Sequence, residues 1–191
     1  MFAKYLELSA SALFLTTLSL YLLDWFTKNN SKKLFVYSIM LFFIYLYMPI
    51  YDNFSVAILL RGLYSDLSVT FICLIMVAYI NKVIYYQNMI FLPKKISLLN
   101  IILSVMLYLS AFGVIDYDIY SHGYSLNLYM IVGVMCFNIM VYLINKKYAW
   151  ILLISTAAYY FEIIPSKNIF DYFIDIPLFI ISVISLFKKT Y

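Results

Sequence analysis

The sequence predicts an all-α integral membrane protein, a bundle of about seven transmembrane helices in which residues 1–191 form one multi-pass domain. Three observations lead to this prediction. The chain is 66% hydrophobic and only 12% charged, whereas a soluble domain carries about 25% charged residues. Its apolar residues form long runs, several near the roughly 17–25 residues that cross a bilayer. The polar gaps between these runs alternate between lysine-rich and acidic stretches.

Seven apolar runs are the expected spans. The first four are residues 5–26, 34–51, 66–86 and 96–115, and the last three are residues 126–144, 148–164 and 173–187. Aromatic residues near several ends, such as Trp25 and Phe26, suit the headgroup layer. Six spans stay an alternative if the last runs are not separate helices.

Residues 55–65, between the second and third spans, allow two interpretations. They form either an outer interfacial helix or an extension of the third span. An unpaired arginine at lipid depth costs about 2.5–3.5 kcal/mol. We therefore expect Arg61 at the outer boundary of the membrane, near a carboxylate.

The charged residues predict the orientation. Ten of the 13 basic residues fall in alternate gaps, and the other three are Lys4, Arg61 and Lys167. Because short cytoplasmic loops are enriched in lysine and arginine, the lysine-rich side faces the cytoplasm. The N-terminus is then outside and the C-terminus inside, which requires an odd number of spans. The expected location is a cell membrane, namely a bacterial inner membrane. The cytoplasmic lysines are Lys28, Lys32, Lys33, Lys82, Lys94, Lys95, Lys146, Lys147, Lys188 and Lys189.

Polar and small residues recur at helical spacing within the apolar runs. Examples are Ser97, Asn100 and Ser104 in the fourth run, and Ser182 and Ser185 in the seventh. Such stripes allow helices to approach closely and to form hydrogen bonds with each other. The alternative interpretation is that they face one another around a hydrated path.

The predicted outer face gathers most of the acidic residues together with the chain's one arginine and one histidine. Three interpretations remain open: a solvated rim, a cation site at Asp116, Asp118 and His122, or a site for a lipid-linked or phosphorylated ligand. In the last case Arg61 binds an anionic group through two hydrogen bonds. The ligand-binding candidates are Arg61, Asp66, Asp116, Asp118, His122, Glu162, Asp171 and Asp175. We assign no metal, no cofactor and no catalytic residue.

The expected function is that of a non-enzymatic accessory, assembly or regulatory membrane component, because the chain carries no recognisable catalytic motif. Its expected partners are the lipid bilayer and another membrane-protein subunit. Nucleic acid is not expected, because the lysines lie beside helix ends rather than in a basic groove. Two alternatives stay open: a passage protein for small solutes or ions, which the polar stripes would form, and an outer-leaflet enzyme or ligand-binding protein.

Overall fold

The computed structural model describes residues 2–27, 31–51, 54–64, 66–85, 92–125 and 127–187. It confirms the predicted all-α class. Within the described residues, the strands are β1 (Pro49–Tyr51) and β2 (Phe54–Ser55), which form a small antiparallel ribbon with Pro49 opposite Ser55. The chain divides into two compact units. Unit 1 comprises Met1–Leu67 and Ile72–Ile90, and unit 2 comprises Ser68–Phe71 and Phe91–Tyr191.

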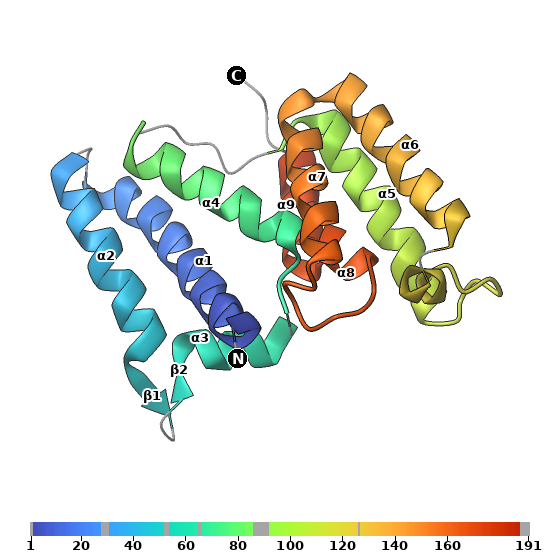
Figure 1. Ribbon diagram of the computed structural model, residues 1–191. Helices are drawn as coiled ribbons and strands as arrows, with labels where there is room; N and C mark the ends of the chain where they lie inside the picture. Colours follow the sequence, from blue (N-terminus) through green and yellow to red (C-terminus); the bar gives the residue numbers. More distant parts are fainter. Residues whose placement is uncertain are drawn as a thin grey trace. The chain divides into compact units, whose positions relative to one another are not determined.

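Unit 1 is built on α1 (Phe2–Thr27), which packs against α2 (Ser31–Tyr47) and α3 (Val56–Tyr64) (Figure 1). Most of α4 (Val69–Val83) belongs to the same unit. Leu20, Leu34 and Val83 form a buried cluster that Tyr79 covers. The Tyr79 hydroxyl lies 2.9 Å from that of Ser38, so α2 and α4 also share a polar contact.

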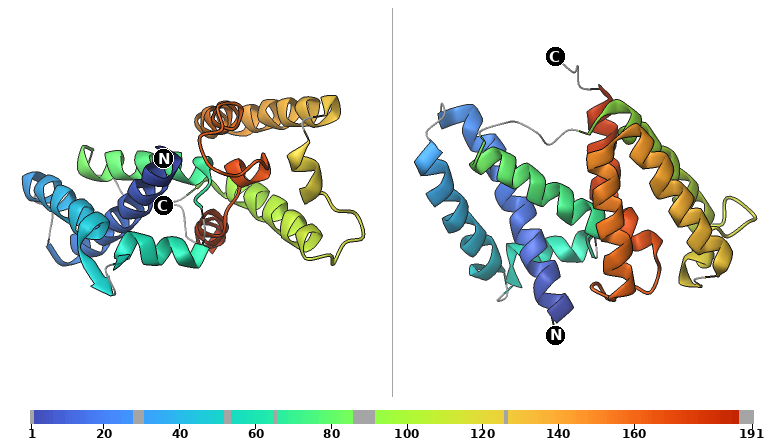
Figure 2. Two further views of the ribbon diagram at one scale, coloured as in Figure 1. Left: turned by 60° about the horizontal axis from the view of Figure 1, so that its bottom comes forward. Right: turned by 45° about the horizontal axis from the view of Figure 1, so that its top comes forward.

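Unit 2 contains two antiparallel helix pairs (Figure 2). The first pair is α5 (Lys94–Ala111) with α9 (Ile176–Phe187), and the second is α6 (Leu128–Ile144) with α7 (Lys146–Tyr160). Asn145 alone separates α6 from α7, and its side-chain oxygen accepts a hydrogen bond of 3.0 Å from the Tyr148 N–H. The 3-10 helix η1 (Tyr120–Tyr124) and the short α8 (Phe170–Phe173) close the other end of the unit.

Among the described residues, two helices are long and apolar enough to cross a membrane, α1 over Tyr5–Leu23 and α5 over Lys94–Ala111. By length and composition alone, these two helices favour a membrane protein. Four shorter apolar helices cover Leu34–Tyr47, Val69–Val83, Leu128–Ile144 and Ile176–Phe187. The helix lengths therefore support two spans directly, and the seven-span bundle remains a proposal.

Several predicted spans are shorter in the structure, each for a local reason. The run 34–51 is interrupted where β1 begins at Pro49. The run 148–164 ends as a helix at Tyr160, and Glu162 adopts a left-handed conformation with φ of 48°. The segment 55–65 forms a helix of its own, α3, over Val56–Tyr64. It is therefore not an extension of the third span.

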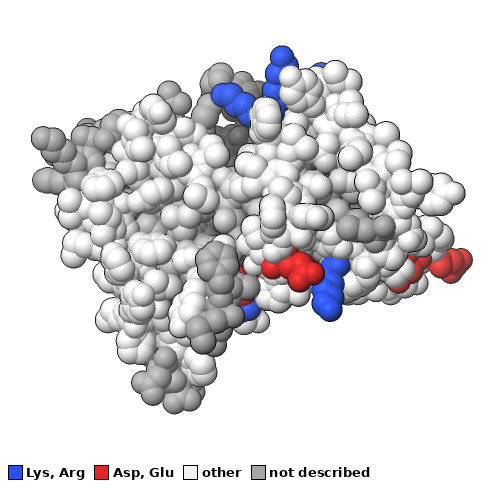
Figure 3. All heavy atoms as spheres, in the orientation of Figure 1, with Lys and Arg blue, Asp and Glu red and all other residues white. Residues whose placement is uncertain are grey.

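Unit 2 carries two lysine pairs at one end, whereas its acidic residues lie at the other end with a basic side chain among them (Figure 3). Lys94 and Lys95 open α5, and Lys146 and Lys147 open α7 beside them. The acidic residues of the unit lie at the opposite end of the helices. In unit 1, Lys82 departs from the predicted pattern, because it lies within α4 and is only 1% exposed, with its Nζ 4.9 Å from the centre of the Tyr21 ring. The side chains of Lys28, Lys32, Lys33, Lys188 and Lys189 lie outside the described residues.

Candidate functional site

The predicted outer residues fall into several groups within the two units. Arg61 and Asp66 belong to unit 1, and the other six candidates belong to unit 2. Within each unit, the hydrogen bonds and exposure of these side chains indicate what each can do.

Arg61 forms an ion-pair cluster with two carboxylates. Its Nε and Nη2 donate to Asp66 Oδ1 at 3.1 and 2.8 Å, and Nη2 also pairs with Glu7 Oε2. Glu7 is 1% exposed. The expectation that Arg61 lies near a carboxylate is therefore confirmed. Both charged partners already engage the guanidinium, which leaves it poorly suited to bind an anionic ligand.

Glu7 was not predicted as a member of this cluster. Its position near the start of the first apolar run was the available signal, because a carboxylate in such a place requires a partner. The chain has only one arginine, and Arg61 was already expected to need an acid. Glu7 and Asp66 share it.

Asp118 organises the loop before η1. Its Oδ1 accepts a hydrogen bond of 3.0 Å from the Ser121 N–H, a bond that stabilises the start of a turn. Asp116 and Glu162 are exposed. The His122 ring contacts the Tyr117 ring in a tilted arrangement, with ring centres 5.1 Å apart. The part of the chain that the structure describes contains no group of three or more histidine, cysteine or acidic side chains able to hold a metal ion.

Asp171 ties η1 to the segment before α8. Its Oδ1 accepts a hydrogen bond of 2.7 Å from the Tyr120 hydroxyl, and its Oδ2 accepts one from Ser166 Oγ. Asn168 Nδ2 donates to the Tyr120 carbonyl at 2.9 Å. Burial and the bond to Asp171 raise the pKa of Tyr120, so its hydroxyl keeps its proton. This carboxylate acts as part of a structural network.

Gly123 allows the close approach of these two segments. Its carbonyl accepts a hydrogen bond of 3.1 Å from the Ile169 N–H. A Cβ atom at this position would lie 2.0 Å from Asn168 Oδ1 and 2.6 Å from a ring carbon of Phe170. Only glycine fits between η1 and the loop before α8.

Asp175 is a buried helix cap. Its Oδ1 accepts from the Leu178 N–H and its Oδ2 from the Ser68 N–H, both at 2.7 Å. The first bond satisfies a free N–H in the first turn of α9. The second anchors Ser68, the residue before α4. In the first turn of α4, Thr70 Oγ1 lies 2.9 Å from Ser155 Oγ. Asp175 thus connects parts of unit 2 that are distant in the sequence.

The polar stripes of the fourth and seventh runs meet where α5 packs against α9. Asn100 Nδ2 donates to Ser182 Oγ at 3.3 Å, and the Tyr148 hydroxyl donates to Asn100 Oδ1 at 2.9 Å. Ser97 and Ser104 are fully buried on the same helix. Asn100, Ser182 and Tyr148 therefore form helix-to-helix contacts, as the first interpretation of the stripes expects.

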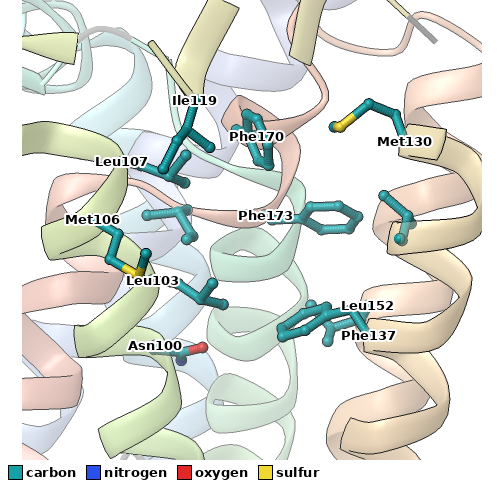
Figure 4. Close-up of a pocket in the computed structure, with 13 residues that line it drawn as sticks. Asn100, Leu103, Met106, Leu107, Ile119, Met130, Phe137, Leu152, Phe170 and Phe173 are labelled. Atoms are coloured by element: carbon teal, nitrogen blue, oxygen red, sulfur yellow. The ribbon is translucent and has the colours of Figure 1, made fainter. Parts of the chain in front are cut away.

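The candidate functional site that the structure offers instead is an apolar pocket in unit 2 (Figure 4). Its volume is about 240 Å³. It extends from Phe170 and Ile119 at the end where η1 and α8 lie to Asn100 at the opposite end. Of the described residues that line it, Asn100 alone has a polar side chain. The wall consists of Asn100, Leu103, Met106, Leu107, Ile119, Met130, Gly133, Val134, Phe137, Leu152, Phe170, Phe173 and Ile174.

The pocket reaches the surface of unit 2 between α5 and α6. Met106 on α5 is 46% exposed and Gly133 on α6 is also exposed, although both line the pocket. Deeper in the pocket, Leu107 and Leu152 are 5% and 2% exposed. Such a lining can hold hydrocarbon and offers no acid, base or nucleophile to a substrate. The chain matches no protein-family model, no curated protein and no solved structure.

Proposed function

We propose that this chain is a multi-pass membrane protein without enzymatic activity, which serves as an accessory, assembly or regulatory component and binds another membrane protein through α6. In this proposal α1, α2, α4, α5, α6, α7 and α9 cross a bacterial inner membrane. The N-terminus is outside and the C-terminus is cytoplasmic. The class and topology follow from the sequence pattern, and the contact surface comes from unit 2.

The observation that carries the proposal is the exposed apolar face of α6 on which Met135 and Ile139 lie. This helix contains no charged residue, and Met135 and Ile139 on it are 61% and 62% exposed. An exposed apolar surface of this kind is stable in lipid or against a partner helix.

The placement of the polar side chains favours this function over the two alternatives. Arg61 is engaged by Glu7 and Asp66, and Asp171 and Asp175 are engaged by hydroxyl and backbone donors. An outer-leaflet enzyme would need some of these groups for its substrate. The stripe that includes Asn100 and Ser182 is buried between helices rather than facing a hydrated path.

The partner surface can be tested with Met135→Trp on α6. Lipid accommodates added apolar bulk, whereas a packed helix contact does not. The tagged protein is purified from its native membranes with its partners, and the yield of each co-purifying subunit is measured. We expect Met135→Trp to lose a subunit that Ile102→Trp retains, because Ile102 is a 51% exposed residue of α5. A wild-type protein that purifies from its native membranes as a monomer, without any co-purifying subunit, would refute the proposal.

The orientation has a separate test in cysteine accessibility. Lys147 and Asp118 are both exposed. Lys147 lies in the first turn of α7, and Asp118 lies just before η1, at the other end of unit 2. Each is replaced by cysteine in a background that lacks Cys73 and Cys136, and intact cells are treated with a membrane-impermeant thiol reagent. We expect labelling at position 118 only. Labelling of both positions from the same side would show that the proposed topology is wrong.

A further inference from the structure

We propose that the pocket between α5, α6, α7 and α8 binds one hydrocarbon chain of a membrane lipid. The inference rests on the proposed membrane location, and it assigns a specific ligand to a site that the proposed function does not use. The occupant is a lipid chain rather than a partner helix because of the size, lining and position of the pocket.

The size of the pocket suits a narrow apolar ligand. Its volume is about 240 Å³, larger than an engineered apolar cavity of about 150 Å³ that binds benzene. It is smaller than the roughly 300–1,000 Å³ of sites for drug-sized ligands. A helix, which is about 10 Å wide with its side chains, does not fit. The lining residues Asn100 and Leu107 are seven positions apart on α5, so the pocket extends about 10 Å along that helix.

The lining excludes polar ligands. Asn100 supplies its one polar side chain, and both ends of that amide are used, the oxygen by Tyr148 and the nitrogen by Ser182. Water would find too few partners in such a space. An apolar occupant restores the dispersion contacts that an empty space withholds from its walls.

The position of the pocket determines which apolar molecule is available. One wall is α5, which is one of the two helices long and apolar enough to span a membrane. The opening lies between α5 and α6, at Met106 and Gly133. Ile102, one turn before Met106 on α5, is 51% exposed and apolar beside the opening. A pocket that opens sideways at this depth opens into the hydrocarbon of the bilayer.

Photolabelling can distinguish a chain in the pocket from lipid around the protein. Wild-type protein is reconstituted in vesicles made of phosphatidylcholine whose acyl chains carry a diazirine at mid-chain. The vesicles are irradiated, and the labelled residues of the protein are identified by mass spectrometry. Bulk lipid reaches Ile102 and Met135, whereas Leu107, Leu152 and Phe173 line the pocket with exposures of only 5%, 2% and 7%. We expect label on these buried residues as well. Label confined to the exposed residues would overturn the proposal.

Gly133→Phe provides the matching variant. A Cβ atom at Gly133 meets no atom within 4 Å, and Met130, Val134 and Phe137 on the same face of α6 line the pocket. The added ring should fill the pocket and lower the label on Leu152 about tenfold, as expected for about 1.4 kcal/mol of lost binding free energy. Met135→Phe adds a ring away from the lining and should leave that label unchanged. Equal label on Leu152 in both variants would contradict the proposal.

Flotation of the same vesicles separates this inference from the proposed function. Protein that floats with the vesicles but carries no label at the buried residues would overturn the lipid site alone. Protein that stays at the bottom of the gradient would overturn the membrane location and the lipid site together. If Gly133→Phe does not fold, the wild-type map decides the question through the label on Leu107, Leu152 and Phe173. Label at Leu152 that disappears at high protein-to-lipid ratio would indicate a second copy of the chain there, and would also overturn the assignment.

Discussion

The hydrogen bond between Tyr148 and Asn100 should account for a measurable part of the stability of unit 2. Its two atoms lie 2.9 Å apart, and both residues are 3% exposed. Leaving a buried donor or acceptor without a partner costs about 1–3 kcal/mol. Tyr148→Phe should therefore lower the free energy of unfolding by about 1.5 kcal/mol and Asn100→Leu by about 2 kcal/mol.

The double variant gives the sharper prediction, because replacing both partners by apolar groups leaves neither a donor nor an acceptor of their hydrogen bond unsatisfied. Asn100→Leu with Tyr148→Phe should cost about 2 kcal/mol rather than the sum of the single variants. In the double variant, the Ser182 hydroxyl can donate to the backbone carbonyl four residues earlier, the kind of bond that Ser185 makes to Ile181 at 2.7 Å. The resulting coupling energy, about 1–1.5 kcal/mol, lies within the range measured between membrane helices.

The assay is reversible unfolding in mixed micelles, followed by the helical signal in circular dichroism. Tyr160→Phe is the matched control, because Tyr160 lies on the same helix as Tyr148 but is 80% exposed. Its effect should stay within about 0.5 kcal/mol. If the cost of the double variant equals the sum of the two single costs within about 0.3–0.5 kcal/mol, the side chains are not coupled and the reasoning is refuted.

Two further predictions concern the ion-pair cluster and the close approach at η1, and the same unfolding assay measures both. Arg61→Gln leaves Glu7 and Asp66 facing each other without a cation and should lower the free energy of unfolding by about 2 kcal/mol. The loss is smaller than for a fully buried ion pair because the Arg61 side chain is 27% exposed. The control Lys167→Gln removes an exposed lysine and should change the stability little, so equal effects of the two variants would contradict the cluster. Gly123→Ala places a Cβ atom 2.0 Å from Asn168 Oδ1 and should cost about 1–3 kcal/mol. In the control Gly62→Ala, the added Cβ atom meets no atom within 4 Å and should stabilise α3 by about 0.5–1 kcal/mol. Loss of stability in both variants would count against a specific close contact at Gly123.

Features that depend on periodicity within one helix could be predicted from the sequence. Asn100 and Ser104 were placed on one face of a helix, and the structure buries both. The need of Arg61 for a carboxylate followed from the cost of an isolated charge and holds for Asp66. Both inferences use only local geometry or the chemistry of one residue.

Features that depend on how distant segments pack could not be predicted. Asp171 and Asp175 looked like free outer acids, because the sequence does not show that Tyr120 and the Ser68 N–H reach them. The pocket depends on α6 packing mainly on α7, which leaves space beside α5. An apolar run of residues has the same composition whether or not its helix borders such a space.

The single residue between α6 and α7 has a consequence for biosynthesis. Asn145 ends one helix and caps the next, so the two apolar segments leave the ribosome with no loop between them. In the proposed topology they must enter the bilayer together as a helical hairpin. Lys146 and Lys147 directly follow the turn and would hold it on the cytoplasmic side. A longer connection between α6 and α7 should allow α6 to insert alone, before α7 has left the ribosome.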